Sequence, residues 1–531
     1  MKRIGKISIA VFLIMSMLLG GCSGQSKSKV TPDPTDDNYR AFYQIFVGSF
    51  SDSDGDGTGD LQGIINRMDY LNDGNMYSEN SLGIQGIWLS PIFESPSYHK
   101  YDASDYYKID EKFGNEEDLV KLINLCHERN VKVILDLVVN HTATNHEWFE
   151  KFVTAHKEGN TNDPYYNFYS WAPEDALTGG IAYTAIPGVS AEYYEGNFSS
   201  EMPELNYDNE TVREEMVKLA KYYLDLGVDG FRFDAIKYIY YNDIERSVDF
   251  WKWYMDELTA YKPDIYCVGE CWSSETETLE YIEALNCFNF QMSQGEGYIS
   301  NAAKGKDINV YTNYIEKYQD KVLEANAEGG MITPFIANHD MDRAAGYVSP
   351  SGKQAHMAAN LYLLCSGSPF IYYGEEIGLK GSRGSANTDA NRRLAMLWGD
   401  EDTVKDPEGT TYDVKKQTNG TVAEQLADET SLLHYYGKLL SLRKQYPEIS
   451  RGDYKALDFG EKNFGGFLIT YKEANTVLLH NTSTEEIVID LTACSDFPAE
   501  LKKVAAFIGQ GEASLEGTTL TLGPQTSAII K

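Results

Sequence analysis

The chain lacks the cysteine and histidine spacings of metal and redox motifs. It has seven cysteines in 531 residues and contains neither a CxxC nor an HExxH motif, so zinc and dithiol chemistry have no support. Cys267 and Cys271 lie four residues apart in a predicted strand, about 13 Å at the rise of a strand. That separation exceeds the roughly 7 Å limit for a disulfide, and we expect the internal cysteines to be buried thiols.

Basic residues are also scarce. The chain has 46 Lys and Arg against 80 Asp and Glu, which gives a formal net charge of -34 and a pI near 4.6. Such a surface would repel phosphates, which excludes nucleic acid as a partner, and the surplus charge favours solubility. The chain is 42% hydrophobic and 24% charged, which is typical of globular proteins. Its length predicts one large domain and a smaller additional unit.

No apolar run is long enough to span a membrane. The N-terminal run, 7–19, follows a basic start and has 13 residues, whereas a spanning helix needs about 20. This pattern is typical of a signal peptide, and it ends in LGGC, which resembles a bacterial lipobox. The resemblance implies a signal peptide over 1–21 and lipidation of Cys22. We therefore expect a bacterial lipoprotein on the extracellular face, with 22–38 as a flexible tether.

Short apolar runs alternate with amphipathic helical segments for some 400 residues. Such alternation predicts a parallel sheet, and eight units of this kind predict a (β/α)8 barrel over 39–141 and 206–451. The long connection 142–205 is rich in Gly, Pro, Asn and aromatic residues, and we interpret it as a subdomain inserted after the third strand. The tail, 452–531, shows strand-like alternation and predicts a terminal antiparallel β-sandwich domain.

Several predicted strands end in charged side chains. The ends of parallel strands form the active site of a barrel, and carboxylates end three of them at Asp234, Glu270 and Asp340. Glycoside hydrolysis needs one ionised carboxylate and one carboxylic acid. Arg232 shares a strand face with Asp234 and favours its ionised form, whereas the apolar neighbours of Glu270 favour a raised pKa. A single Asp at such a position is more often a turn residue, but the combination favours an active site.

Four segments carry a family resemblance. DLVVNH (136–141), GFRFDAIKY (230–238), GECW (269–272) and FIANHD (335–340) resemble, in this order, the signature regions of the α-amylase family, glycoside hydrolase family 13. MPELN (202–206) sits where that family has a further motif, and the resemblance extends from about Tyr43 to the C-terminus. It implies a retaining double displacement with Asp234 as nucleophile, Glu270 as general acid/base and Asp340 as transition-state stabiliser.

The same resemblance assigns the residues that hold a sugar. SYHKYDASDY (97–106) matches the loop after the second strand, with Tyr101 as the stacking platform. RLAM at 393–396 departs from the usual RxPM, for which we expect only a local effect on the loop. The residues expected to bind substrate are His99, Tyr101, Asp102, His141, Arg232, Lys237, Tyr238, His339, Arg343 and Arg393.

The preferred linkage follows from the residues after the nucleophile. Ala235 stands where α-1,6-acting relatives usually have Val, and Lys237-Tyr238 resembles the amylase pattern; both favour α-1,4 bonds in starch and maltodextrins. MPELN departs from the QPDLN of oligo-1,6-glucosidases and from the MPKLN of neopullulanases, which suggests an intermediate subfamily. The sequence leaves open whether the enzyme cleaves inside the chain or from its end. It also leaves open two alternative activities: that of an exo-acting α-glucosidase or oligo-1,6-glucosidase, and that of a neopullulanase-type hydrolase or transglycosylase.

A loop near the N-terminus concentrates aspartates. DSDGDGTGD (52–60) begins like an EF-hand, but Gly63 stands where a bidentate Glu is needed and a strand precedes the loop. The loop instead resembles the metal-binding loop after strand 1 in the oligo-1,6-glucosidase-like branch. The resemblance implies a structural Ca²⁺, with Mg²⁺ as the alternative, and a second metal near Asn140 stays open. The expected ligands of the first metal are Asp52, Asp54, Asp56, Asp60 and the Thr58 carbonyl.

A non-enzymatic function is the main rival. Barrel proteins that resemble this family but have lost the catalytic carboxylates exist, and a surface lipoprotein could bind glycans without cleaving them. Asp234, Glu270 and Asp340 are all present here, which favours the enzyme. The expected partner is an α-glucan or maltooligosaccharide substrate, the expected contact with the membrane is the N-terminal anchor alone, and the expected state is a monomer.

Overall fold

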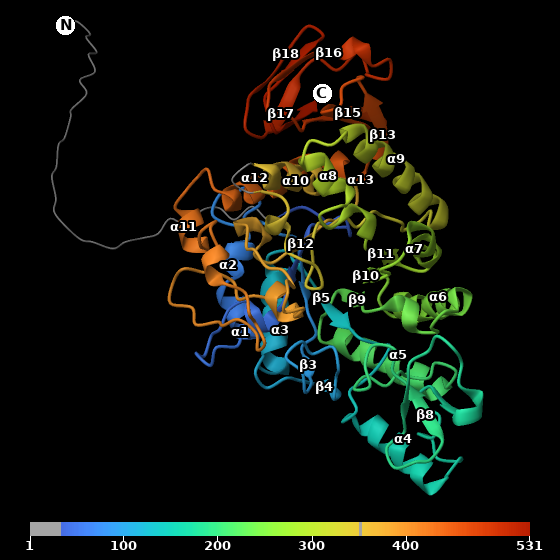
Figure 1. The fold of residues 1–531 in the computed structure, drawn as a ribbon. Helices are drawn as coiled ribbons and strands as arrows, with labels where there is room; N and C mark the ends of the chain where they lie inside the picture. The colour runs from blue at the N-terminus through green and yellow to red at the C-terminus, as the bar shows by residue number, and fades with distance from the viewer. Residues whose placement is uncertain (1–32, 350–352) are drawn as a thin grey trace, which may run out of the picture.

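The centre of the molecule is a parallel barrel. A computed structural model describes residues 33–349 and 353–531, and it contains a seven-stranded sheet in the order β11-β10-β9-β5-β2-β1-β12 (Figure 1). These strands are β1 Phe42–Ile45, β2 Gly86–Leu89, β5 Lys132–Leu137, β9 Gly230–Phe233, β10 Tyr266–Gly269, β11 Asn286–Cys287 and β12 Phe370–Tyr372.

The seventh of the eight predicted strands is reduced to two bridges. Within the segment predicted to form it, Thr333 pairs with Phe288 and Phe335 pairs with Phe370, both in parallel. Because Phe288 follows β11 and Phe370 begins β12, these bridges join the two edges of the sheet and close the ring. The predicted (β/α)8 fold is therefore confirmed, with its seventh unit held by isolated bridges.

Apolar residues fill the barrel and cover its outside. The interior holds a cluster of aromatic and aliphatic side chains that includes Phe42, Trp88, Tyr266 and Phe370, which leaves the polar side chains at the strand ends for the mouth. The helices of the surrounding layer are α1 Leu61–Asn66, α2 Met68–Leu71, α3 Glu116–Glu128, α5 Glu210–Asp225, α6 Ile244–Tyr261, α7 Glu275–Ile282, α8 Tyr298–Ala303, α9 Ile308–Ala325, α10 Gln354–Leu363, α11 Val422–Leu426, α12 Leu432–Gln445 and α13 Glu448–Arg451.

The helices begin where the sequence supplies a capping side chain. The side chain of Asn115 accepts a hydrogen bond at the start of α3, and Asn209 and Asp243 do the same for α5 and α6. Such a cap satisfies one of the free N–H groups of the first turn. In α3 the buried residues Leu119, Leu122, Ile123 and Cys126 recur at helical spacing, so one face packs on the barrel while the acidic first turn faces solvent.

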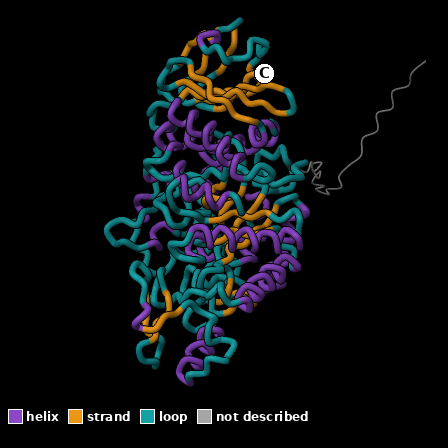
Figure 2. Tube along the Cα trace, turned by 90° about the vertical axis from the view of Figure 1, so that its right-hand side faces the viewer, coloured by secondary structure: helices purple, strands orange, loops and turns teal. Residues whose placement is uncertain are grey.

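The long connection after β5 forms a separate small unit. It contains α4 Glu147–Glu158 and a three-stranded antiparallel sheet of β6 Trp171–Pro173, β8 Glu192–Glu195 and β7 Tyr183–Ala185. A short hairpin, β3 Phe93–Glu94 with β4 Asp105–Ile109, follows the second barrel strand. The views in Figures 1 and 2 place α4 at the end of the molecule opposite the C-terminal strands.

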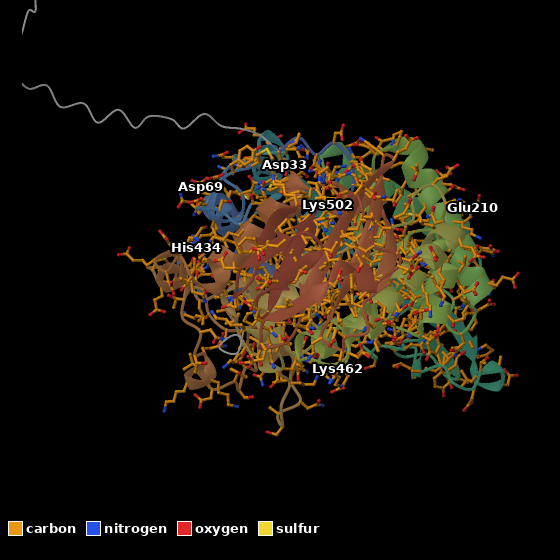
Figure 3. All side chains as sticks on the ribbon, turned by 90° about the horizontal axis from the view of Figure 1, so that it is seen from above. Asp33, Asp69, Glu210, His434, Lys462 and Lys502 are labelled. Carbon is orange, nitrogen blue, oxygen red and sulfur yellow. The ribbon has the colours of Figure 1, made fainter. Side chains whose placement is uncertain are left out.

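The C-terminal residues form two antiparallel sheets with a common core. The five-stranded sheet contains β13 Asp453–Asp458, β14 Phe464–Tyr471, β15 Ala474–Asn481, β20 Thr526–Ile530 and β17 Val504–Ile508. The three-stranded sheet contains β16 Ile487–Asp490, β19 Thr519–Leu522 and β18 Ala513–Glu516. Buried residues of both sheets, such as Val477 and Leu520, pack into one cluster, so the predicted sandwich is confirmed; Figure 3 looks down on it.

The end of the predicted tether is bound to the barrel. Asp33 is buried and accepts a hydrogen bond from Gln85 (2.8 Å), while Asn130 donates to the carbonyl oxygens of Asp33 (2.8 Å) and Thr35 (2.7 Å). Residues 33–38 are thus part of the folded domain, contrary to the predicted tether of 22–38. Cys22 and the signal peptide lie outside the described residues.

Two further expectations concern the described residues. All six cysteines among them are free and buried, as the strand spacing of Cys267 and Cys271 predicts. Within 33–349 and 353–531, no helix is both long and apolar enough to cross a membrane.

Candidate active site

The carboxyl ends of the barrel strands open into one large cavity. Its volume is about 1070 Å³, at the upper end of the range for small-molecule sites. Seven of the predicted residues line it: His99, Tyr101, His141, Asp234, Glu270, Asp340 and Arg393. The strands β9 and β10 and the segment after Thr333 carry the three carboxylates to this mouth, as predicted from the strand ends.

Three carboxylates share a single arginine. Arg232 is fully buried; its Nη1 donates to Asp136 and Asp234 (both 2.7 Å), and its Nη2 donates to Glu270 (2.6 Å). The guanidinium lies over the Trp88 ring at 5.1 Å, a cation–π contact from the barrel interior. Arg232 therefore acts from beneath the cavity, holding the carboxylates rather than lining the surface.

Burial decides the protonation of this cluster. Burial raises the pKa of Asp234 to about 6 and that of Asp136 to about 6, although Arg232 lowers both. The pKa of Glu270 rises to about 7 for the same reason. The raised pKa of Glu270 agrees with its predicted acid role. As expected, Arg232 favours the ionised form of Asp234, but burial outweighs this effect and the pKa stays above its usual value.

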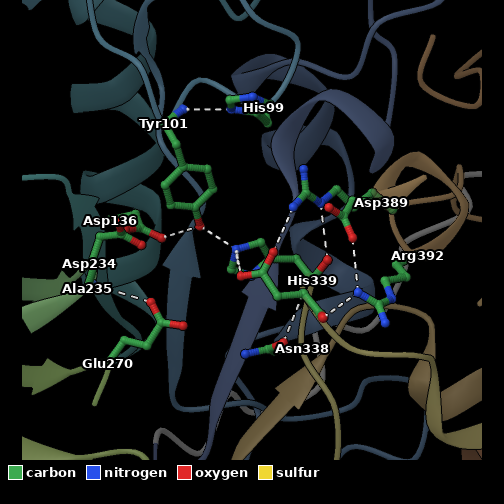
Figure 4. A network of polar contacts seen from close by, with 12 residues as sticks. His99, Tyr101, Asp136, Asp234, Ala235, Glu270, Asn338, His339, Asp389 and Arg392 are labelled. Atoms are coloured by element: carbon green, nitrogen blue, oxygen red, sulfur yellow. Dashed lines mark hydrogen bonds and ion pairs between the residues drawn. The ribbon is translucent and has the colours of Figure 1, made fainter. Parts of the chain in front are cut away.

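Backbone geometry joins two of these carboxylates. Ala235 follows Asp234 at φ 48°, ψ 43°, in the left-handed region that non-glycine residues rarely occupy. Its N–H lies 3.3 Å from the Glu270 carboxylate, and Figure 4 shows the contact. The turn after β9 thus directs a donor toward Glu270, and the strained residue lies where function most often maintains strain.

Asp340 has the opposite electrostatic setting. Burial acts to raise its pKa, but His339, Arg393 and Arg232 together hold the pKa well below its usual range. His339 Nε2 lies 2.9 Å from one carboxylate oxygen and Arg393 Nη2 donates to the other at 2.7 Å. Asp340 therefore stays ionised across the cavity from a carboxylate pair that can hold a proton.

Aromatic and imidazole rings fix the wall between these groups. The Tyr101 hydroxyl donates to Asp136 (2.8 Å) and lies 2.6 Å from His339 Nε2, and the two rings are stacked at 5.2 Å (Figure 4). Gln44 donates to the other ring nitrogen of His339 at 2.7 Å. His141 lies 3.1 Å from the Tyr101 carbonyl, and burial lowers the pKa of His141 to about 4. The imidazole of His141 is therefore neutral at ordinary pH.

Other predicted substrate residues lie beside or behind the cavity. Asp102 accepts hydrogen bonds from Ser95 (2.8 Å) and Ser97 and shapes its own loop. Lys237 donates to the Trp272 carbonyl at 2.9 Å, and the ring of Tyr238 packs 4.4 Å from that of Phe198. These contacts stabilise the walls from outside.

Arg343 does not belong to the cavity. Its guanidinium is buried between the rings of Tyr372 and Tyr373, at 4.3 and 4.5 Å. It donates to the carbonyl oxygens of Arg392 (2.9 Å) and Tyr373 (2.6 Å). Its predicted role in substrate binding is therefore wrong: Arg343 ties together two loops below the rim.

The structure adds two cavity residues that the sequence does not mark as substrate-binding. Phe198 from the inserted unit and Trp272 after Glu270 are 44% and 42% exposed, and both line the cavity. Each ring is supported by another, Phe198 by Tyr238 at 4.4 Å and Trp272 by Phe290 at 5.0 Å. The position of Trp272, two residues after Glu270, could have indicated it; nothing in the sequence singles out Phe198 from the other aromatics of its segment.

Charged side chains also form part of the rim. Arg392 donates to the Asp340 carbonyl (2.7 Å), to Asp342 (2.8 Å) and to Asp389 (3.0 Å), as Figure 4 partly shows. Arg383 pairs with Asp389 at 2.8 Å. This network holds the loop that carries Arg393 against the segment that carries Asp340.

The aspartate loop forms a separate acidic cluster away from the cavity. Carboxylate oxygens of Asp52, Asp54 and Asp60 lie within 4.8 Å of one another, and an all-oxygen donor set of this kind fits Ca²⁺ or Mg²⁺. Asp56, predicted as a ligand, lies outside the cluster and accepts from the Thr58 N–H at 2.6 Å. Asp60 also caps α1 through the Gly63 N–H (2.7 Å), so the loop is built into the first helix.

Asn140 lies at the junction with the inserted unit. Its amide nitrogen is 3.4 Å from His141 Nδ1, and it also contacts the buried Glu204, whose pKa burial raises to about 7. Among the described residues, the one grouping of three or more His, Cys, Asp or Glu suited to a metal is that of Asp52, Asp54 and Asp60.

Comparison with known proteins agrees with this architecture. The family of the alpha amylase catalytic domain matches residues 44–452. Alpha-amylase 3 of Dictyoglomus thermophilum is 34% identical over 495 residues, covering 92% of each chain. Oligo-1,6-glucosidase of Bacillus cereus is 30% identical over 528 residues, covering 85% of this chain and 91% of its own.

A solved structure extends the likeness to three dimensions. Eubacterium rectale Amy13B superposes with a TM-score of 0.85 at 34% identity, covering 95% of this chain and 97% of its own. Relatives named for amylase and for oligo-1,6-glucosidase activity both match, in agreement with the intermediate placement that MPELN suggests. Because the matched region contains the barrel, the inserted unit and all the carboxylates that Arg232 and Arg393 hold, the chain belongs to the alpha-amylase catalytic domain family.

Proposed function

We propose that this glycosidase is a membrane-anchored α-amylase that cleaves internal α-1,4-glucosidic bonds of starch and maltodextrins with retention of configuration. The observation that carries the chemistry is the single guanidinium of Arg232, which binds Asp234 at 2.7 Å and Glu270 at 2.6 Å. Two carboxylates held by one arginine lie close together. Retaining glycosidases need a separation of about 5–5.5 Å, whereas inverting ones need room for a water between the two groups.

The contacts of each carboxylate support one role. Asp234, which Arg232 binds at 2.7 Å and favours in its ionised form, attacks the anomeric carbon and forms a glycosyl ester as the glycosidic bond breaks. Glu270, with a pKa of about 7, gives its proton to the departing glycosidic oxygen and later takes one from the attacking water. Asp340, held ionised by His339 and Arg393, stabilises the positive charge that develops on the sugar ring.

The shape of the cavity supports binding of a chain rather than of one sugar. Phe198 and Trp272 present partly exposed rings to the cavity, and Trp272 lies two residues from the proton donor. Apolar ring faces are suited to the C–H faces of glucose units, and the position of Trp272 beside Glu270 places it on the leaving-group side. A substrate that continues past the cleaved bond would use this surface.

A metal and a lipid anchor complete the proposal. Asp52, Asp54 and Asp60 would hold a Ca²⁺ ion, with the Thr58 carbonyl as a further oxygen, and the ion would supply charge neutralisation and rigidity to the first loop. Lipidation at Cys22 would hold the enzyme on the extracellular face of the membrane, as the LGGC sequence indicates. An α-glucan would reach it there from outside the cell.

The first test is a product profile on maltoheptaose, isomaltotriose, sucrose and pullulan. We expect internal cleavage of maltoheptaose into short maltooligosaccharides, measured by chromatography over the early part of the reaction. Glucose released from chain ends alone, or faster hydrolysis of isomaltotriose, would contradict the proposed specificity. Products longer than maltoheptaose would instead identify a transglycosylase.

Trp272→Ala tests the leaving-group surface. We expect kcat/KM for maltoheptaose to fall about three- to tenfold and that for maltotriose to fall less, because only the longer chain reaches past Glu270. Trp272→Phe should recover most of the loss. Tyr261, 47% exposed on α6 outside the cavity, provides the matched control as Tyr261→Ala. An equal fall in kcat/KM for both substrates would show that Trp272 does not bind the part of the chain beyond the cleaved bond.

The pH profile tests the two carboxylates. Asp234 must be ionised and Glu270 protonated, so kcat/KM should rise through about pH 6 and fall above about pH 7. Glu270→Gln cannot transfer a proton, and its rate on maltoheptaose should fall by about 10²- to 10⁴-fold with loss of the alkaline limb. Glu280→Gln, at an exposed position on α7, should leave the profile unchanged. A Glu270→Gln variant that keeps both rate and alkaline limb would exclude Glu270 as the acid.

Chelation tests the metal loop. We expect EDTA to lower Tm by several degrees and to remove one bound ion per chain, measured by differential scanning calorimetry and elemental analysis. Asp54→Asn should abolish both effects, whereas Asp56→Asn should preserve them because Asp56 lies outside the cluster. Unchanged Tm and metal content on chelation would rule out a structural metal here.

A further inference from the structure

The N-terminal segment is bound where the barrel strands begin. Its partners are Gln85 and Asn130, which precede β2 and β5, and Ser368, which precedes β12 and donates to the Asn38 carbonyl at 2.7 Å. Lys132, the first residue of β5, donates to the Asn38 side chain at 3.1 Å. The segment therefore crosses the base of the barrel, the face opposite the cavity.

Ion pairs add to this attachment. Arg451 of α13 pairs with both carboxylate oxygens of Asp37, at 2.7 Å each, and Arg40 donates to the Thr35 carbonyl at 2.8 Å. A bidentate arginine–carboxylate pair has a defined orientation. The point where the described chain begins is thus a fixed position on the barrel and not a loosely attached end.

The cavity lies on the other side of the strands. The longest barrel helices have 18 residues, about 27 Å at the rise of an α-helix, and these run between the base and the mouth. The inserted unit that contributes Phe198 lies farther still, at the end that carries α4 (Figures 1 and 2). Ten residues, 23–32, separate Cys22 from Asp33 at the base, and a chain of that length reaches at most about 40 Å when fully extended.

An edge of the C-terminal sheet adjoins the base. Lys472 lines a groove with Asp36, Asp37 and Arg451, and the backbone N–H groups of Lys502 and Lys503 both donate to Lys531. This edge has four exposed lysines, Lys472, Lys502, Lys503 and Lys531, beside the exposed carboxylates Asp36, Asp453, Glu473 and Glu500. Lys531 pairs with Glu448 at 2.6 Å and Arg451 pairs with Asp37, so charges of the two signs are nearly balanced. In a chain with 80 acidic and 46 basic residues, it is a surface that anionic headgroups repel little. Figure 3 labels Asp33 and Lys502 in the view from above.

We propose that the barrel base and the adjoining lysine-bearing edge of the C-terminal sheet face the lipid bilayer, so that the catalytic cavity opens away from it toward the surrounding medium. This inference rests on the proposed lipidation of Cys22. The connection leaves the folded chain at the base, so the base lies nearest the anchor, and the body of the barrel then separates the cavity from the headgroups. An anchored enzyme in this orientation meets long α-glucans at its outer end, without the bilayer limiting their access.

Energy transfer to a labelled bilayer tests this orientation. The lipidated full chain is placed in vesicles of phosphatidylcholine and phosphatidylglycerol that carry an acceptor dye on their headgroups. A donor dye is attached to Lys502→Cys at the sheet edge or to Ser385→Cys, an exposed position on the loop between Arg383 and Asn387 at the rim of the cavity. Because the cysteines among the described residues are buried, the unsubstituted chain serves as the labelling control. We expect strong transfer from Lys502→Cys and at least fivefold weaker transfer from Ser385→Cys.

The outcomes separate the two proposals. If neither the full chain nor the Cys22→Ala variant co-floats with the vesicles in a density gradient, the proposed lipid anchor is wrong, and the proposed orientation is wrong with it. If the chain floats but both donors transfer equally, or Ser385→Cys transfers more, the orientation alone is wrong. A second measurement is independent of dyes: kcat/KM on long maltodextrins should be the same within twofold for the vesicle-bound and detergent-solubilised enzyme. A large fall on reconstitution would mean that the bilayer covers the cavity.

Discussion

The catalytic side of this barrel depends on one buried guanidinium. Arg232 binds carboxylates that end three neighbouring strands, β5, β9 and β10. Removing a carboxylate from water costs several kcal/mol even after relaxation, so none of these groups could be buried at the mouth without a fixed positive charge. A single side chain therefore holds all three carboxylates, and Trp88 supports it from below.

The same arrangement creates an electrostatic difference across the cavity. Three carboxylates share one guanidinium on one side, and burial leaves the pKa values of Asp234 and Glu270 near 6 and 7. On the other side Asp340 has Arg393 and His339 to itself, and its pKa is low. One carboxylate that is always ionised thus faces a pair that can carry and exchange a proton, which is the division of labour that glycoside hydrolysis requires.

Much of this site could be predicted because it lies at strand ends. Alternation along a strand places Arg232 and Asp234 on one face, and the barrel rule brings Glu270 and Asp340 to the same mouth. The raised pKa of Asp234 could not be predicted in this way, because it comes chiefly from burial, to which the charge of Asp136 adds. Asp136 lies on β5, nearly one hundred residues away from Arg232 in the chain.

The remaining differences between the predictions and the structure lie in the loops and near the N-terminus. Arg343 follows Asp340 closely in sequence, yet its side chain points away from the cavity and binds the Arg392 and Tyr373 carbonyls. Sequence spacing does not predict these partners, and they determine the orientation of the side chain. Residues 33–38 have the polar composition of a tether, but Gln85, Asn130 and Arg451 bind them. The composition of a segment does not predict contacts with residues far away in the sequence, and the contacts of 33–38 with these three residues are of that kind.

The aspartate loop contacts the segment that follows Arg393 and does not line the cavity. Asp52 accepts from the Thr403 hydroxyl at 2.6 Å, and the Gly57 carbonyl accepts from the Lys405 N–H at 2.9 Å. The segment so fixed, 395–405, follows directly after Arg393, which holds Asp340 ionised. A cation among the aspartates would therefore stabilise the segment that follows Arg393 without approaching the substrate.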